Sequence, residues 1–148
     1  MSAAYQANCA AYSKKLAALD GQYKNVIAKA PVKAVLFGDR FPFRYLADDY
    51  GLKYYAAFKG CSAETEASFE TIVFLANKVD ELGLNTVLTI ESGDGKIART
   101  IIENTAAKSA QVLQMDSMQS TTAQNVADGA TYLSIMEKNL DVLKEALK

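Results

Sequence analysis

Residues 35–45 decide which fold this chain can adopt, and they read Val-Leu-Phe-Gly-Asp-Arg-Phe-Pro-Phe-Arg-Tyr. The apolar run over residues 32–37 is typical of a buried strand and ends at Gly38. Asp39 and Arg40 follow, before a short helical pattern over residues 41–49 with Pro42 in its first turn. In α/β proteins, ligands bind in the crevice at the carboxyl ends of such strands. Asp39 and Arg40 are therefore candidate site residues.

The same alternation of strand and helix patterns continues to the end of the chain. Apolar runs predict further strands over residues 52–58, 85–90 and 110–115. Helical spacing predicts one helix with apolar positions from Phe69 to Leu82, one over residues 96–106 and a last one capped by Asp128, with irregular chain over 117–127. Such alternation is typical of parallel strands with helices on both faces. We expect an α/β fold, a three-layer α/β/α sandwich around a four-stranded parallel sheet.

A long helix is predicted before the first strand, over residues 3–29, and Pro31 ends it. Its apolar residues recur at alternating spacings of four and three: Tyr5, Cys9, Tyr12, Leu16, Leu19, Tyr23 and Val26. A helix packed on the domain surface would show this stripe. A helix that runs past its own domain, toward a neighbour absent from this chain, would show it too and would explain the length, since typical helices have only about 11–12 residues. Packing on the domain surface is the simpler expectation.

Composition excludes several classes of protein. The 148 residues suffice for one domain with a real core, and the net charge of −1 implies no nucleic-acid partner. No apolar run approaches the ~18–20 residues of a membrane helix, and no signal peptide is predicted at Met1. The sequence has no histidine, which removes the commonest general base and metal ligand. Cys9 and Cys61 could form one disulfide, although two free thiols are the simpler expectation.

Three carboxylates follow strands of the predicted sheet: Asp39, Glu91 and Asp116. The carboxyl ends of parallel strands share one edge of a sheet, so these side chains should gather there. Carboxylate oxygens suit Mg²⁺, Ca²⁺ or Mn²⁺ and can complete a zinc site that other residues supply with imidazoles. Helix capping, solvated turns, or ion pairs with Arg40 and Arg44 would also explain the three residues.

The chain resembles the C-terminal lobe of the solute-binding proteins of zinc and manganese ABC transporters (cluster A-I), over nearly its whole length. The resemblance rests on motifs in order: the helix with Tyr12, Leu16, Leu19, Asp20 and Tyr23; Phe37-Gly38-Asp39-Arg40-Phe41-Pro42-Phe43-Arg44-Tyr45-Leu46 with Asp49-Tyr50-Gly51-Leu52; Ser62-Ala63-Glu64-Thr65-Glu66-Ala67-Ser68; Glu91; Asp116-Ser117; and Tyr132-Leu133-Ser134-Ile135-Met136-Glu137-Lys138-Asn139-Leu140.

This resemblance implies a non-catalytic metal receptor with two α/β lobes joined by a rigid helix. Residues 1–30 would be that inter-lobe helix, and residues 31–148 the C-terminal lobe, the N-terminal lobe being absent. The metal, zinc or manganese, would lie between the lobes, bound by Asp39 and Asp116 from this one. Glu91, Arg40 and Glu66 would support those ligands without touching the metal.

The resemblance also implies partners and a location. The whole protein would carry an export signal, act as a periplasmic protein or membrane-anchored lipoprotein, and deliver its ion to a membrane permease. An isolated lobe would bind metal weakly, and its exposed inter-lobe face could favour self-association.

Two other functions fit the residues. One is a Mg²⁺-dependent doubly wound enzyme acting on a phosphorylated substrate, with Arg40, Arg44 and Lys96 as the only available cations for the phosphate. The segment Ser92-Gly93-Asp94-Gly95-Lys96 would then serve as a phosphate loop, although a tight turn with a helix cap explains it more simply. The other is a receptor lobe that has lost metal binding and recognises an organic ligand through Arg40 and the aromatic residues Phe41, Phe43, Tyr45, Tyr54 and Tyr55.

Overall fold

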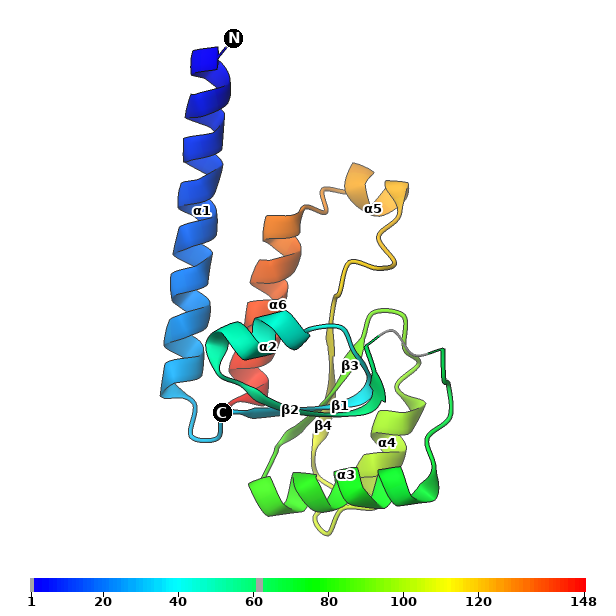
Figure 1. Ribbon diagram of the computed structural model, residues 1–148. Helices are drawn as coiled ribbons and strands as arrows, with labels where there is room; N and C mark the ends of the chain where they lie inside the picture. Colours follow the sequence, from blue (N-terminus) through cyan, green and yellow to red (C-terminus); the bar gives the residue numbers. More distant parts are fainter. Residues whose placement is uncertain (1, 61–62) are drawn as a thin grey trace.

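A computed structural model describes residues 2–60 and 63–148 of the chain (Figure 1). One sheet of four parallel strands runs in the order β2-β1-β3-β4. The elements, in chain order, are α1 (Ser2–Lys29), β1 (Ala34–Phe41), α2 (Arg44–Tyr50), β2 (Lys53–Lys59), α3 (Phe69–Leu82), β3 (Thr86–Ile90), α4 (Lys96–Glu103), β4 (Gln111–Met115), α5 (Ala123–Ala127) and α6 (Tyr132–Ala146).

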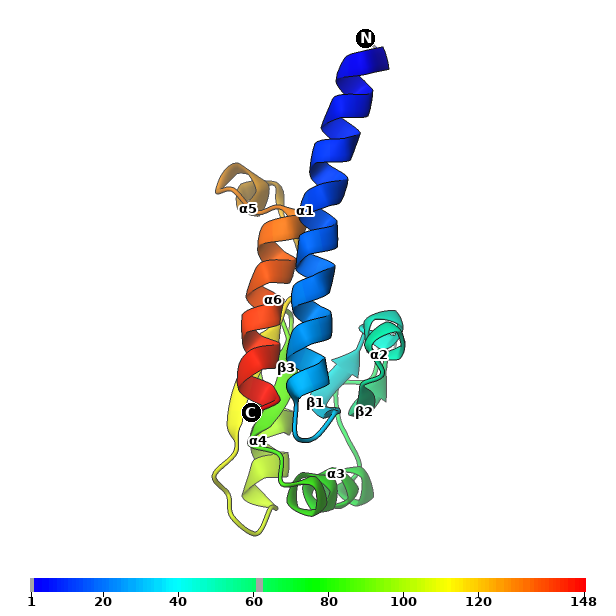
Figure 2. The same ribbon diagram turned by 90° about the vertical axis from the view of Figure 1, so that its left-hand side faces the viewer.

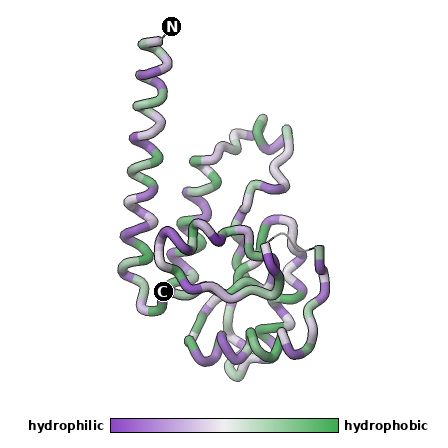
Figure 3. The backbone as a smooth tube through the Cα atoms, viewed as in Figure 1, coloured by the Kyte–Doolittle hydropathy of each residue, from purple (hydrophilic) through white to green (hydrophobic). Residues whose placement is uncertain are grey.

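Helices cover both faces of the sheet, which confirms the predicted three-layer sandwich (Figure 2). One core lies between the sheet and α1, α2 and α6, where Tyr23, Phe37 and Leu143 are almost completely buried. The second core lies between the sheet and α3 and α4, around Leu36 and Ile101. Figure 3 shows hydrophobic and hydrophilic residues alternating along the helices, including the protruding part of α1.

The first strand is longer than predicted. The apolar pattern places its end at Gly38, yet β1 runs on to Phe41, with an irregular register against β2 between Phe37 and Arg40. Gly38 has a packing role instead, because a Cβ there would lie 2.5 Å from Ala98 Cα of α4. The missing side chain lets α4 approach the strand closely. Asp39 therefore lies inside the strand.

Several predicted boundaries are corrected at the helices. Pro42 lies between β1 and α2, because that helix begins at Arg44. Residues 117–127 are not wholly irregular, since Thr122 and Asn125 form a capping box that starts the short helix α5. The last helix is capped by Thr131, whose side chain accepts a hydrogen bond from Ser134 N, while Asp128 follows α5. The first turn of α3 carries Glu70, and Ser68 is its N-cap.

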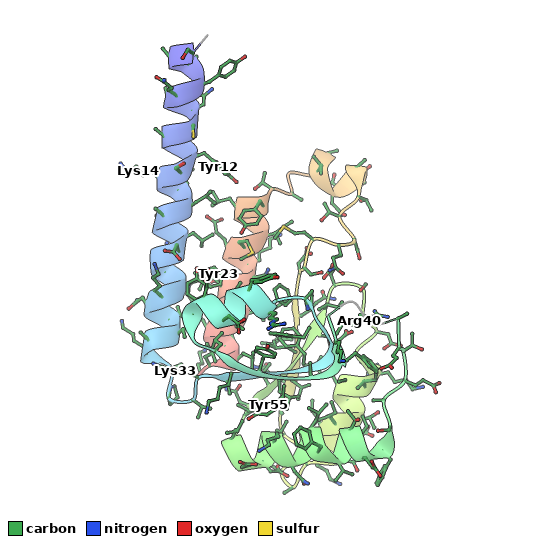
Figure 4. The ribbon with its side chains drawn as sticks, in the orientation of Figure 1. Tyr12, Lys14, Tyr23, Lys33, Arg40 and Tyr55 are labelled. Carbon is green, nitrogen blue, oxygen red and sulfur yellow. The ribbon has the colours of Figure 1, made fainter. Side chains whose placement is uncertain are left out.

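Helix α1 extends well beyond the sandwich, as its length suggests (Figures 1 and 2). Residues 2–15 are all exposed, and the predicted stripe is covered only from Leu16 onward. Figure 4 shows Tyr12 on the protruding part and Tyr23 near the sheet. None of the helices in the described ranges is apolar enough over a sufficient length to cross a membrane.

Two stacked tyrosines anchor the base of α1. The rings of Tyr23 and Tyr50 stack with centroids 5.5 Å apart, and the Tyr23 hydroxyl donates to the carbonyl of Met136 in α6 at 2.6 Å. The Tyr50 hydroxyl donates to Asp20 Oδ1 at 2.7 Å, and Lys24 Nζ donates to the other carboxylate oxygen at 2.6 Å. Burial, the largest cause, raises the pKa of both phenols, so they remain donors. Three helices are thereby joined through one contact cluster.

Cys9 takes no part in this contact cluster. Cys9 is exposed on the protruding part of α1, and its thiol is free. Cys61 lies outside the described residues. The alternative of a disulfide between Cys9 and Cys61 therefore lies outside them too.

Candidate functional site

The turn after β4 holds Asp116 at the carboxyl edge of the sheet. This segment, residues 116–119, is called the Asp116 loop below. Asp116 Oδ1 accepts a hydrogen bond from Met118 N at 2.7 Å. Met118 adopts a left-handed backbone, φ 63°, which costs a residue with a Cβ roughly 1–2 kcal/mol. A conformation of that cost persists only where surrounding contacts hold it.

Glu91, the residue after β3, supplies many of those contacts. Its carboxylate accepts hydrogen bonds from Ser117 N at 2.8 Å, from Ser117 Oγ at 2.7 Å and from Gln119 N at 3.1 Å. Burial disfavours the charged form and is the largest single influence on Glu91. The hydrogen bonds from Ser117, Gln119 and the backbone of Glu91 itself together outweigh it, so the pKa of Glu91 lies below its ordinary value of 4.5. Glu91 is therefore an ionised brace for the Asp116 loop.

A second brace comes from α6. Asn139 is only 2% exposed, and its amide bonds the backbone of Asp116 on both sides: Nδ2 donates to the Asp116 carbonyl at 2.9 Å, and Oδ1 accepts from Asp116 N at 2.8 Å. The sequence interpretation assigns Asn139 no role. A signal is present nonetheless, because Asn139 interrupts the apolar stripe of α6 between Met136 and Leu143. A polar residue at a core position is worth examining, since burying it is costly unless it is hydrogen-bonded.

The Asp116 loop borders an open cavity of about 350 Å³. Oxygen-bearing side chains and one amine line most of it: Glu91, Asp116, Ser120, Thr121, Asn125 and Lys138. Within the described part of the chain, Asp116 Oδ1 is hydrogen-bonded and no hydrogen bond to Oδ2 is found. Asp116 thus presents a carboxylate oxygen beside a polar cavity, as the binding of a cation requires.

Asp39 lies at the same edge of the sheet but in different surroundings. It is 9% exposed, its Oδ1 accepts from Arg40 N at 2.8 Å, and its Oδ2 accepts from Ile90 N at 3.3 Å. A Cβ at Gly93 would overlap Oδ2, so the glycine makes room for this carboxylate. These residues, 39, 40, 90 and 93, are called the Asp39 corner. Oδ2 joins β1 to the end of β3, Oδ1 bonds within β1 itself, and each oxygen keeps a further lone pair.

The Asp39 corner borders a smaller cavity, of about 240 Å³, which lies between the end of β1 and the turn that leads into α4. The structure therefore brings Glu91 and Asp116 together at one cavity, and Asp39 and Arg40 at another. Figure 4 shows Arg40 at the end of β1. Its guanidinium donates to the carbonyl of Glu64 at 3.3 Å. Glu66 is exposed in the segment before α3.

Arg44 and the segment before α4 make local contacts. Arg44 pairs with Asp48 in the next turn of α2, at 3.6 Å. In the segment before α4, Asp94 Oδ1 accepts from Lys96 N at 2.9 Å, and Gly95 has a left-handed φ of 72°. This geometry is the tight turn with a helix cap that the sequence favours over a phosphate loop.

Among residues 2–60 and 63–148, no group of three or more His, Cys, Asp or Glu side chains is arranged to hold a metal ion. A third cavity, about 810 Å³, lies beside the edge strand β2 and is lined by aromatic and charged residues that include Phe41, Arg44, Tyr54 and Phe58. Phe41 and Tyr54 stack there with centroids 4.2 Å apart.

The chain is similar to proteins of the ZnuA and AdcA type. The family model described as the periplasmic component A of zinc-uptake complexes, ZnuA, matches residues 1–146. The chain is 31% identical over 141 residues to the zinc-binding lipoprotein AdcA of Streptococcus pneumoniae, covering 95% of this chain and 27% of that protein. It is 30% identical over 143 residues to the high-affinity zinc uptake system protein ZnuA of Bacillus subtilis, covering 97% of this chain and 43% of that protein.

A solved structure shows the same fold. The Zn(II)-bound ZnuA-like domain of Streptococcus pneumoniae AdcA superposes with a TM-score of 0.72 at 30% identity, covering 97% of this chain and 52% of that one. The chain thus spans less than half the length of these two curated relatives and about half of the solved ZnuA-like domain.

Proposed function

Because this chain belongs to the ZnuA family of zinc-uptake components, we propose that it is the C-terminal lobe of an ABC-transporter solute-binding protein that carries zinc or manganese. The family match over residues 1–146 carries the proposal. The coverage supports the assignment to one lobe, since nearly all of this chain aligns with about half of a ZnuA-like domain. The function is binding and delivery of an ion and involves no catalysis.

In this proposal Asp116 is the main ligand that the lobe offers. Its carboxylate borders a polar cavity, and its backbone is held from two sides by Glu91 and Asn139. Asp39 is the second proposed ligand, through the lone pairs that its backbone contacts leave over. Arg40 and Glu66 are the proposed supporting residues beside Glu91. With no histidine in the chain, imidazole ligands must come from the missing lobe.

The same proposal assigns a role to the protruding helix α1 and a location to the complete protein. Residues 1–30 form the inter-lobe helix, and the exposed residues 2–15 pack against the missing N-terminal lobe. The complete protein works outside the cytoplasm, periplasmic or anchored as a lipoprotein, and passes its ion to a membrane permease. The isolated lobe exposes Tyr12 and Tyr132, 44% and 53% accessible, and self-associates through them.

A zinc titration of the full-length gene product that contains residues 1–148 tests the function. We expect tight Zn²⁺ binding by calorimetry, weakened about ten-fold or more by Asp116→Ala, a change of about 1.4 kcal/mol or more. Asp128→Ala, which removes an exposed carboxylate beyond α5, is the matched control and should bind zinc like the unaltered protein. A parallel Mn²⁺ titration ranks the two ions. Absence of binding by the unaltered full-length protein would rule the metal function out.

A second candidate is a receptor lobe for an organic ligand. The aromatic cavity beside β2, about 810 Å³ and lined by Phe41, Arg44 and Tyr54, favours it because its size suits a small molecule. Tyr54→Ala should abolish the binding of such a ligand and leave zinc binding unchanged. A fluorescence screen of aromatic carboxylates against Tyr54→Ala and Asp116→Ala separates the two candidate functions.

A further inference from the structure

Asn139 has a polar side chain at a core position of α6. Its amide hydrogen-bonds the backbone of one residue, Asp116. The neighbouring inward positions of α6 are Ile135, Leu140 and Leu143, all buried. An amide among them is costly to bury unless both its donor and its acceptor are used. Asn139 uses both on Asp116, at 2.9 and 2.8 Å, and a weaker contact runs from Nδ2 to Met136 Sδ at 3.7 Å.

Asp116 is where the sheet stops supplying backbone partners. The ladder between β3 and β4 ends at the pair Ile90 and Met115. The next residue, Asp116, would leave its N–H and carbonyl without strand partners. The Asn139 amide takes the place of a strand for this one residue and fixes the peptide groups on both sides of its Cα. The direction of the Cα–Cβ bond is fixed in consequence, and the hydrogen bond from Met118 N to Oδ1 then holds the carboxylate.

Glu91 and Asn139 act on different parts of the turn. Glu91 holds the residues that follow, through Ser117 and Gln119. Asn139 holds Asp116 itself and does not line the cavity, whereas Lys138 and Ile135 of the same helix do. A residue that bonds both sides of one ligand's backbone, without bordering the cavity, is placed to orient that ligand.

We propose that Asn139 is a positioning residue that sets the Asp116 carboxylate for cation binding. This inference rests on the proposed metal function and extends it to a residue that does not touch the ion. A ligand whose backbone is fixed before the ion arrives loses less freedom on binding, and the affinity is correspondingly higher. Positioning partners of metal ligands commonly change affinity 10–100-fold when they are altered.

The test is a double-mutant cycle in the full-length gene product, with Zn²⁺ affinity measured by competition with a chromogenic chelator. Asn139→Leu keeps the size of the side chain and removes both hydrogen bonds, and it should weaken zinc binding about ten-fold. In the Asp116→Ala background, Asn139→Leu should have no further effect, because its influence passes through Asp116. A merely structural role would lower the affinity by the same factor in both backgrounds and would overturn the inference.

Two further variants keep the cycle interpretable. Leu143→Ala opens a cavity in the same helix without touching Asp116, and its folded fraction should bind zinc like the unaltered protein. Asn139→Ser, small and polar, replaces Asn139→Leu if that variant does not fold, and should also weaken binding. Unchanged affinity in every folded Asn139 variant, with Asp116→Ala still impaired, would refute the positioning role alone. Equal binding by the unaltered protein and Asp116→Ala would refute it together with the proposed role of Asp116.

Discussion

The Asp39 corner and the Asp116 loop place the same side chain at the same edge of one sheet, in opposite conditions. At the Asp39 corner, both carboxylate oxygens accept backbone N–H groups, and the side chain is nearly buried. At the Asp116 loop, the backbone is what the neighbours hold, and the carboxylate borders an open cavity. The hydrogen bonds of the two carboxylates thus show how far each one also serves the fold: Asp39 through both oxygens, Asp116 through one.

The largest expected effect is on stability at the Asp39 corner. Asp39→Ala leaves the buried N–H of Ile90 and the N–H of Arg40 without their acceptor, which should lower the free energy of unfolding by about 3 kcal/mol. Asp116→Ala removes one acceptor at a half-exposed turn and should cost about 1 kcal/mol. Equilibrium urea unfolding of the 148-residue variants measures both. Equal losses would mean that the two carboxylates do not differ as described.

A smaller loss of stability is expected when a methyl group is added to the Asp39 corner than when the Asp39 carboxylate is removed. Gly93→Ala drives a Cβ into Asp39 Oδ2, and the displacement should cost about 2 kcal/mol, a usual overpacking penalty. Gly21→Ala is the matched control in α1, where nothing lies within 4 Å of the added carbon, and it should stabilise the chain by up to ~1 kcal/mol. Thermal unfolding compares them. If Gly93→Ala were as stable as the unaltered chain, the tight fit of Asp39 against the turn would be wrong.

The smallest effect is expected at the brace of the Asp116 loop. Glu91→Gln replaces ionised acceptors with an amide and should cost about 1 kcal/mol at pH 7. Because the pKa of Glu91 is lowered on folding, its contribution is complete above pH 4.5 and is lost as the pH falls through the lower folded value. The difference in unfolding free energy between the two proteins should therefore shrink in acid. A difference that stays constant from pH 7 to pH 3 would contradict this account.

The layers of the fold could be predicted from the sequence because each element carries a periodic signal of its own. The apolar runs and the helical stripes are local, and they were sufficient for four parallel strands covered on both faces. The end of β1 could not be read in the same way. Gly38 marks a turn in the sequence pattern, whereas its function depends on Ala98, a residue distant in the chain.

The candidate site was likewise predictable only where a local sequence pattern carries the information. That Asp39, Glu91 and Asp116 share an edge follows from the parallel direction of the strands, which the alternation of strand and helix patterns indicates. Which of them borders which cavity depends on side-chain hydrogen bonds across the sheet, such as that from Ile90 N to Asp39, which no local pattern contains. Asn139 is an intermediate example. The sequence shows a polar residue on an apolar stripe, but it does not show that the partner is the backbone of Asp116.

Because Tyr23 and Tyr50 hold only the base of α1, a small rotation of the helix there moves its far end by a large distance. From Tyr23 to its exposed end, α1 extends about 30 Å at 1.5 Å per residue, so a rotation of about 10° at the tyrosines moves the far end by about 5 Å. In the proposed two-lobed protein, Tyr23, Tyr50 and Asp20 would then be the pivot that sets the width of the gap between the lobes. The aperture through which an ion enters would be governed by contacts far from any residue that binds it.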